Sequence, residues 1–411
     1  MRHGQSEANV EHIWQGTGSS LLTELGRSQA ASAGLRLAAR QFSVVVSSDL
    51  DRAIDSARMA GFEPDQREIW REGDLGEWEG LTFAEVVEQF GDELRRLNDG
   101  EDVPLGTTGE STRQVSDRAL KGIEEILSEL DDGQSALVVT HGGLLNGLIR
   151  RILGMPPGGR RLGIPANTSL SEVTFGEDAV RLNRFNDAHH LGPVTTWTRE
   201  HLKHRLPVFE LIRHGQTDSN VSGRVQGHAD GGLNDLGREQ AQKLAAWIGD
   251  VDASYTSSLG RARETAEIVF GVAAHPIDAL REIDMGAWNG ALWAELATDD
   301  LFHRVFVEHQ DLRRGGTGET WVELQTRMEG FLSDSAGSHE GQRVGVVSHA
   351  GSIKAIVGGA LGLDFASSRA LLGTLDNTSV TQVIMMRGGP MVASYNVAGH
   401  LEGRPQSANL R

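Results

Sequence analysis

Short runs of apolar residues recur along the chain, and each run leads into a polar motif. The runs lie at 44–46, 137–139, 208–212 and 344–347. Continuous apolar runs of this length are typical of strands that are buried on both faces of a parallel sheet. The pattern therefore predicts strands at these four positions.

Amphipathic stretches between the runs predict helices. Residues 24–40 and 236–248 show helical spacing of apolar positions, and Thr23 and Asn234 stand where a side chain caps a helix N-terminus. Strands that alternate with helices predict an α/β fold. In such sheets, ligands bind outside the carboxyl ends of the strands, which is where the polar motifs fall.

The polar motifs occur twice and in the same order. RHGQSEAN, which begins at Arg2, is answered by RHGQTDSN, which begins at Arg213, and four later motifs are repeated as well. Self-similarity of this extent indicates a duplicated domain. We expect two domains, 1–195 and 206–411, joined by a short polar linker with helical potential.

The two copies differ at their starts. An apolar run precedes Arg213, whereas Arg2 follows Met1 directly. If the missing strand is central in the sheet, its neighbours keep unpaired backbone groups, at about 1–3 kcal/mol for each buried group. We therefore expect either a natural start upstream of Met1 or an impaired first copy, and the second copy is the better supported one.

Composition and charge exclude several classes of function. The 411 residues contain no Cys, which excludes disulfides and thiolate chemistry. A formal net charge of −18 argues against nucleic-acid binding, which needs clustered Lys and Arg. No apolar stretch approaches the roughly 20 residues that cross a bilayer, so we expect no membrane partner and a cytoplasmic location. A small phosphorylated metabolite remains compatible, because nearby cations outweigh distant, screened charges.

Neither a metal site nor a cofactor is expected. His189, His190, His201 and His204 lie near the linker, but their spacing matches no zinc pattern and no Cys or carboxylate completes one. The sequence also lacks the G-x-x-x-x-G-K-[ST] loop of phosphate-binding kinases.

The residue types that recur in both copies suit a phosphate pocket with a nucleophile. A neutral imidazole can attack phosphorus and carry the group covalently, and His3 and His214 are our candidates. Guanidinium groups can stabilise the charge of the transferring phosphoryl group. The candidates for this role are Arg2, Arg52, Arg213 and Arg261.

Two further residue types complete the predicted pocket. His141 and His349 follow apolar strands and are candidate donors to the phosphoryl group. A carboxyl must protonate the leaving oxygen and then activate water, a role worth about 10²–10⁴-fold in rate. Glu72 and Glu282 qualify by their position in the repeat.

These motifs resemble the histidine phosphatase superfamily, also called phosphoglycerate mutase-like, over nearly the whole chain, twice. The resemblance rests on RHGQ(S/T)xxN, on E-x-x-x-G-x-W-x-G from Glu72 and Glu282, and on the strand followed by HGG or HAG. It implies a three-layer α/β sandwich with a mostly parallel sheet, phosphohistidine at His3 and His214, and no metal. It also implies that four amides line the pockets: Asn9, Gln15, Asn220 and Gln226.

One departure from the shared pattern selects between two arginines. The second copy reads TSSLGRARE, and its spacing aligns Arg261, and not Arg263, with Arg52. A substitution of Arg263 should therefore matter less for the pocket.

Three functions remain open at this stage. Hydrolysis of phosphomonoesters of small metabolites is the leading hypothesis. The rival within the family is a phosphoglycerate mutase, whose members carry a longer, Arg-rich insertion than 81–108 or 291–317 provide. The alternative of another class is a tandem phosphate-binding protein with one inactive copy.

Overall fold

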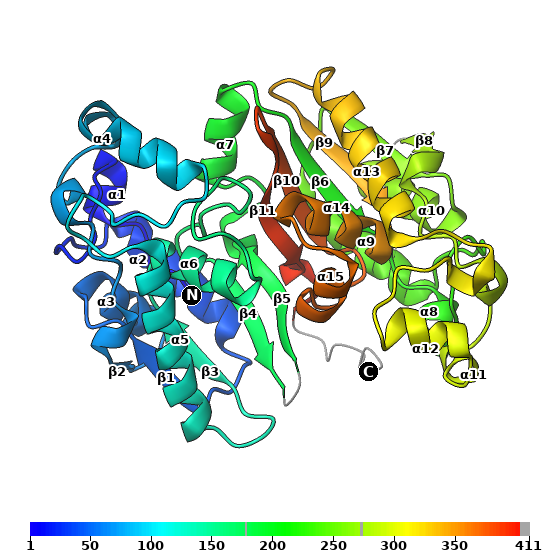
Figure 1. The fold of residues 1–411 in the computed structure, drawn as a ribbon, viewed down its shortest axis with the longest axis horizontal. Helices are drawn as coiled ribbons and strands as arrows, with labels where there is room; N and C mark the ends of the chain where they lie inside the picture. The colour runs from blue at the N-terminus through cyan, green and yellow to red at the C-terminus, as the bar shows by residue number, and fades with distance from the viewer. Residues whose placement is uncertain (177–178, 272–273, 403–411) are drawn as a thin grey trace. The chain divides into compact units, whose positions relative to one another are not determined.

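The computed structural model describes residues 1–176, 179–271 and 274–402. The predicted domains 1–195 and 206–411 include 177–178, 272–273 and 403–411, which lie outside the described residues. The chain divides into two compact units, Met1–Ser171 and Glu172–Arg411 (Figure 1).

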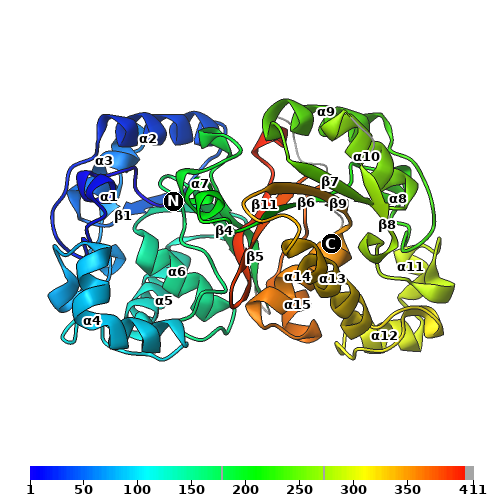
Figure 2. The same cartoon turned by 90° about the horizontal axis from the view of Figure 1, so that it is seen from above.

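The first unit has a parallel sheet of three strands in the order β2-β1-β3, formed by Asp65–Gln66, Val44–Ser47 and Ala136–Val139. Helices α2 and α3 lie on one side of the sheet, and α5 and α6 lie on the other (Figure 2). Each side has its own buried cluster, one around Leu37 and Ala57 and one around Trp70 and Leu144. The helices of this unit are α1 Glu7–Glu11, α2 Glu24–Leu37, α3 Asp51–Met59, α4 Phe83–Asn98, α5 Thr112–Glu129 and α6 Gly142–Ile152.

An eight-stranded sheet, in the order β4-β5-β11-β10-β6-β9-β7-β8, organises the second unit, and the unit boundary falls within β4. Strands β6, β9, β7 and β8 run parallel, whereas β10 pairs antiparallel with β6, β11 with β10, and β5 with β11. The strands are β4 Leu170–Phe175, β5 Val180–Asp187, β6 Val208–Arg213, β7 Ala253–Ser257, β8 His275–Ile277, β9 Arg343–Ser348, β10 Val380–Met386 and β11 Gly389–Val397.

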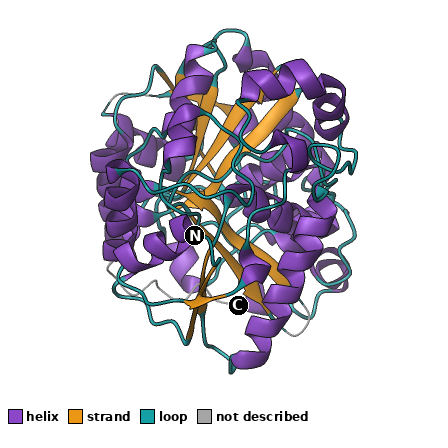
Figure 3. Ribbon diagram, turned by 90° about the vertical axis from the view of Figure 1, so that its left-hand side faces the viewer, coloured by secondary structure: helices purple, strands orange, loops and turns teal. Residues whose placement is uncertain are grey.

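Helices lie on both sides of the strands (Figure 3). Helices α9 and α10 cover one face, and α13, α14 and α15 cover the other (Figure 2). The helices are α7 Thr196–Lys203, α8 Asp218–Ser222, α9 Asp235–Ile248, α10 Gly260–Phe270, α11 Trp293–Leu296, α12 Asp300–Phe306, α13 Trp321–Ala336, α14 Ala350–Leu361 and α15 Phe365–Leu371. The predicted α/β sandwich is confirmed.

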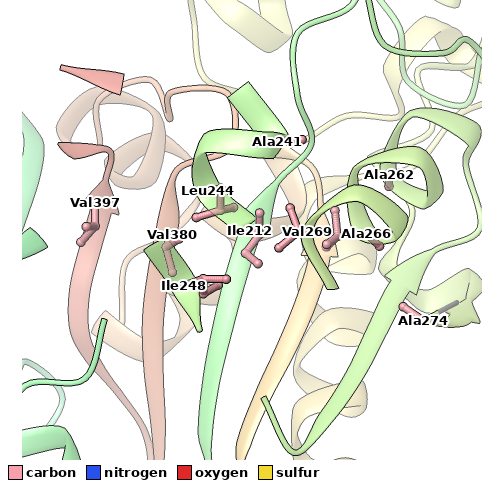
Figure 4. Packing of buried hydrophobic residues seen from close by; sticks show 11 residues of the cluster. Ile212, Ala241, Leu244, Ile248, Ala262, Ala266, Val269, Ala274, Val380 and Val397 are labelled. Atoms are coloured by element: carbon pink, nitrogen blue, oxygen red, sulfur yellow. The ribbon is translucent and has the colours of Figure 1, made fainter. Parts of the chain in front are cut away.

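A buried apolar cluster fixes strand β6 in the middle of its sheet. Ile212 of β6 and Val380 of β10 pack against Leu244 and Ile248 of α9, with Ala266 of α10 beside them (Figure 4). Small alanines on the helices let the helix backbones come close to the sheet, which raises packing density. The cluster therefore holds the strand whose end carries Arg213 and His214.

The local elements agree with the sequence patterns. Each of the four apolar runs forms the body of a strand, and Thr23 and Asn234 cap α2 and α9 by accepting hydrogen bonds from Gly26 and Gly237 at 3.0 and 2.8 Å. The linker contains helix α7. In the first unit, the place that β6 takes in the second unit holds only a parallel bridge between Arg2 and Thr140.

Candidate active site

Both candidate sites form at the carboxyl ends of parallel strands. In the second unit, β6 ends at Arg213, β7 at Ser257 and β9 at Ser348, and His214, Arg261 and His349 follow these ends directly or within a few residues. The first unit repeats this arrangement with β1 and β3. Because parallel strands present their carboxyl ends at one edge of a sheet, the residues that follow them share a site.

The two candidate nucleophiles have the same hydrogen bond. His3 Nδ1 lies 2.7 Å from the carbonyl oxygen of Gly4, and His214 Nδ1 lies 2.7 Å from that of Gly215. A carbonyl oxygen can only accept, so Nδ1 must carry the proton in both rings. The opposite nitrogen, Nε2, then keeps its lone pair, which is the state that a nucleophile requires.

The second histidine of each pair lies beside the first. The ring centroids of His3 and His141 are 5.2 Å apart, and those of His214 and His349 are also 5.2 Å apart. His349 Nε2 is 2.8 Å from Ser257 Oγ, while its buried Nδ1 has no partner among the described residues. When the Ser257 hydroxyl donates to Nε2, Nδ1 carries the proton and can donate to an anion.

Four arginines hold their guanidinium groups in matching positions. Arg52 donates to the carbonyls of Gly18 and Gly16 at 2.8 and 2.7 Å, and Arg261 donates to Ala229 and Gly227 at 2.9 and 2.8 Å. The other arginine of each pocket is also held by a backbone carbonyl. Arg2 donates to the carbonyl of Pro165, and Arg213 donates to that of Leu375.

Each of these guanidinium groups keeps at least one buried N–H without a partner among the described residues. Among the described residues, a buried Nε without a hydrogen-bond partner occurs in each of Arg2, Arg52, Arg213 and Arg261. A buried charged donor without an acceptor is costly, by about 1–3 kcal/mol or more. An oxyanion in the pocket would satisfy these donors, and this repeated deficit is the strongest structural indication of an anion site.

Burial and the arginines keep the histidines neutral. Burial lowers the pKa of His214 well below its ordinary value, and the cations Arg261 and Arg213 lower it further. The pKa of His3 is lowered in the same way by burial and then by Arg2 and Arg52. Neutral imidazole therefore predominates at neutral pH, and in this state each ring can act as a nucleophile.

The predicted proton donors lie at helix N-termini. Glu72 accepts from the backbone N–H groups of Gly143 at 2.8 Å and Leu144 at 2.7 Å, at the start of α6. Glu282 accepts from Gly351 at 3.1 Å and Ser352 at 3.2 Å, at the start of α14. These bonds fix the orientation of each carboxyl group, and each carboxylate acts electrostatically on the two arginines of its pocket.

The small residues after the second histidine have a specific use. A Cβ atom on Gly143 would lie 2.8 Å from Glu72 Oε1, and one on Gly351 would lie 2.4 Å from Glu282 Oε1. The HGG and HAG motifs therefore leave room for the glutamate carboxyl.

The amides that were expected to line the pockets serve partly in local networks. Asn220 Oδ1 caps the start of α8, and Gln226 Nε2 donates to Thr217 Oγ1 at 2.7 Å. Asn9 has the corresponding place at α1, where its Oδ1 accepts from Ser6 and Asn167. Gln15 differs from Gln226, because its Nε2 is buried and has no partner among the described residues.

Several residues outside the predicted catalytic and phosphate-binding sets support the pockets. Asn377 Nδ2 donates to the His214 carbonyl at 3.0 Å, and Asn167 donates to the His3 carbonyl at 3.1 Å. Arg327 donates to the Glu282 carbonyl at 2.9 Å, as Arg118 does to that of Glu72 at 3.3 Å. The recurrence of all four residues in the repeat was the available signal.

The two sites differ at one loop position. His228 Nε2 lies 2.9 Å from the Glu282 carbonyl oxygen in the second site, and the repeat places Thr17 at the corresponding position of the first. Burial, Arg261, His214 and Arg327 lower the pKa of His349, and His228 lowers it as well. Arg263, in contrast to buried Arg261, is exposed.

Neither a metal cluster nor a spanning helix stands out in the part of the chain that the structure describes. Within 1–176, 179–271 and 274–402, no group of three or more His, Asp or Glu residues is arranged to hold a metal ion. In the same ranges no helix combines the length and the apolar character needed to cross a membrane.

The fold and its strand-end sites define an α/β protein of the sandwich type, and sequence comparison identifies its family. Residues 1–188 and 209–398 each match the model of the histidine phosphatase superfamily (branch 1). The chain therefore belongs to the histidine phosphatase superfamily and contains two tandem copies of its domain.

Named relatives resemble one copy at a time. A metal-independent phosphoserine phosphatase of Arabidopsis thaliana is 33% identical over 200 residues, covering 46% of this chain and 82% of the relative. A glucosyl-3-phosphoglycerate phosphatase of Mycolicibacterium vanbaalenii is 38% identical over 167 residues, covering 38% and 73%. A probable phosphoglycerate mutase of Proteus mirabilis is 32% identical over 184 residues, covering 43% and 84%. The relatives are thus phosphatases and mutases whose names specify small phosphorylated metabolites.

Proposed function

We propose that the chain hydrolyses phosphomonoesters of small metabolites through a phosphohistidine intermediate on Nε2 of His214 and of His3. The observation that carries the proposal is the paired arrangement at each site. One imidazole has its proton fixed on Nδ1, and two buried guanidinium groups beside it each keep a donor without a partner among the described residues.

In the first step, Nε2 attacks phosphorus while the bond from phosphorus to the ester oxygen breaks. The glutamate carboxyl, in its protonated state, gives its proton to that leaving oxygen. The unpartnered Nε–H groups and the second histidine donate to the phosphoryl oxygens, where negative charge spreads in the transition state. Glu282 is assigned this proton transfer at the second site, and Glu72 at the first.

In the second step, a water molecule attacks the phosphorus atom that is bonded to Nε2. The glutamate, now a carboxylate, takes one proton from the water as the nitrogen–phosphorus bond breaks and its electron pair returns to Nε2. Inorganic phosphate leaves, and both the histidine and the glutamate recover their initial protonation states. Besides the ester and one water molecule, the cycle as written uses only side chains of the protein.

Two considerations favour hydrolysis over mutase chemistry. Two of the named relatives are phosphatases, although a third is a probable mutase. The segments that follow the glutamate motifs, 81–108 and 291–317, are short and offer little chain for a dedicated lid that would retain a phosphorylated intermediate.

A hydrolysis screen with site variants tests the proposal. Phosphoserine, 3-phosphoglycerate and a panel of sugar phosphates are assayed with the unmodified chain, His3→Ala, His214→Ala and the double variant. We expect each single variant to lose the share of its own site and the double variant to lose all hydrolysis, while His303→Ala, at an exposed histidine, serves as the control.

Other outcomes have defined meanings. Isomerisation of 3-phosphoglycerate faster than its hydrolysis would establish the mutase instead. Tight phosphate binding without turnover of any ester would support the tandem binding protein. Full activity in the double variant would refute the proposed nucleophiles.

A further inference from the structure

Strand β5 belongs to one repeat by sequence and to the other by packing. Its residues, Val180–Asp187, fall inside the first family match, 1–188. Yet they lie in the second compact unit, which begins at Glu172, and they pair antiparallel with β11. The second unit therefore contains a strand that its own repeat does not encode.

Strand β5 supports the loop at 372–378, which in turn holds the second site. Gly373 donates its N–H to the Leu182 carbonyl at 2.9 Å, and Asn396 Nδ2 bridges the carbonyls of Asn183 at 2.9 Å and Thr374 at 3.3 Å. The Leu375 carbonyl of this loop accepts from the Arg213 guanidinium group.

The same loop also fixes the nucleophile. Asn377 Nδ2 donates to the His214 carbonyl at 3.0 Å, and Thr378 N–H donates to the Arg213 carbonyl at 3.0 Å. A displacement of the loop would therefore move both Arg213, which is proposed to bind phosphate, and the attacking His214.

One charged contact joins β5 to this loop. Arg184 is only 4% exposed and forms ion pairs with Asp376 at 3.4 Å, Asp187 at 3.2 Å and Glu402 at 3.0 Å. Asp376 also acts electrostatically on Arg213, because its charge raises the pKa of that guanidinium group against the larger lowering by burial. Asp376 therefore forms an ion pair with one cation, Arg184, and acts electrostatically on a second, Arg213 of the phosphate pocket.

The contact has no counterpart in the first repeat. The sequence repeat places Ala166 where the second copy has Asp376, and Ser394 where the first copy has Arg184. An opposite-charge pair therefore arises only when the strand of the first repeat, with Arg184, meets the loop of the second repeat, with Asp376. This is the combination that supports the second site.

We propose that Arg184, supplied by the first repeat, is a positioning residue for the phosphate pocket of the second repeat. It neutralises Asp376, so that Arg213 stays directed at the phosphoryl group instead of being drawn toward an uncompensated carboxylate. The second site thus depends on a residue outside its own family match. This inference rests on the proposed function for its kinetic readout, but not for its binding readout.

Activity of the second site is measured alone in a His3→Ala background. We expect Arg184→Ala to lower kcat/KM by about tenfold or more, as for removal of one partner of a buried charge pair. Asp376→Asn added to Arg184→Ala removes the uncompensated charge and should restore much of the loss. Arg181→Ala, at an exposed arginine of the same strand, is the matched control and should have little effect.

Binding of inorganic phosphate separates this inference from the proposed function. In a chain with His3→Ala and Arg52→Ala, which weakens the first pocket, calorimetry should show a phosphate Kd about tenfold higher when Arg184 is replaced. Absence of hydrolysis in the His3→Ala chain would count against the proposed function alone. Unchanged kcat/KM and phosphate Kd in Arg184→Ala would overturn the inference, as would a loss that Asp376→Asn fails to rescue, including one caused by unfolding.

Discussion

At the scale of single residues, one hydrogen bond decides which imidazole nitrogen can react. The Gly215 carbonyl accepts from Nδ1 of His214 at 2.7 Å, which leaves the lone pair on Nε2. Burial and the flanking arginines then keep that ring unprotonated. Tautomer and charge state are thus set by separate groups, and each can be altered independently.

Replacing Arg261 should change the pH dependence of the second site. Arg261→Met removes a cation that lowers the pKa of His214, so the pKa of this ring should rise. In a His3→Ala background, the acid limb of kcat/KM should therefore move to higher pH, in addition to any loss of rate. Arg263→Met, on the exposed side of the same helix, is the control. An acid limb that stays in place, or moves equally in both variants, would contradict the assignment.

The role of Glu282 predicts a dependence on the leaving group. Glu282→Gln keeps an acceptor oxygen at the start of α14 but cannot supply a proton. Hydrolysis of alkyl phosphates should fall by about 10²–10⁴-fold, whereas an aryl phosphate with an acidic leaving group should lose much less in its first step. A uniform loss across both substrate classes in single-turnover measurements would argue against proton transfer by this residue.

The residue types of the site were predictable from the sequence, but several contacts were not. The repeated histidines, arginines and glutamates identify themselves by recurrence. Asn377 recurs equally, yet its bond to the His214 carbonyl spans 163 positions, and nothing local to the motif indicates the partner. The amide networks of Asn220 and Gln226 were equally hidden, since a side chain's choice between ligand and neighbour depends on tertiary geometry.

At the scale of elements, the junction of helix α14 with the site depends on a missing Cβ. On Gly351 that atom would lie 2.4 Å from Glu282 Oε1, which is the end of a flexible side chain. Gly351→Ala should therefore leave the fold intact but displace the carboxyl, lowering kcat in the direction of Glu282→Gln. Gly330→Ala, where an added Cβ meets nothing within 4 Å, is the control. Unchanged kcat in Gly351→Ala, with a normal melting temperature, would contradict this account.

Strand and helix positions followed from local patterns, whereas one pairing did not. The run at 208–212 forms the body of β6 because it is apolar enough to be buried on both faces, and Asn234 begins α9 by capping it. The pairing of Phe185 with Tyr395 joins two strands that the repeat makes equivalent. Local sequence cannot specify such a pairing, since the choice depends on which sheet edge is open.

At the scale of the whole molecule, the buried neutral histidines predict sensitivity to mild acid. Burial is the largest cause of the lowered pKa of His3, His141, His214 and His349. An unfolded chain binds their protons below about pH 6.5, while the folded chain does not until lower pH. Their contribution to stability is therefore complete above about pH 6.5 and is lost as pH falls toward the folded pKa.

As pH falls from about 6.5 toward the folded pKa, each of these histidines should lower the free energy of unfolding by about 1.4 kcal/mol per pH unit. Urea unfolding midpoints between pH 7.5 and 5.5 measure the slope, and His141→Gln with His349→Gln should flatten it. A midpoint independent of pH over this range would contradict the neutral state of the histidines.

The most direct test of the central claim is to trap the phosphorylated enzyme by rapid quenching with a ³²P-labelled substrate. We predict a label that is stable to alkali and labile to acid, as expected for phosphohistidine. The label should be reduced in His3→Ala and in His214→Ala and absent from the double variant. A label that persists in the double variant, or hydrolysis by the unmodified chain without any trapped label under single-turnover conditions that slow the second step, would contradict it.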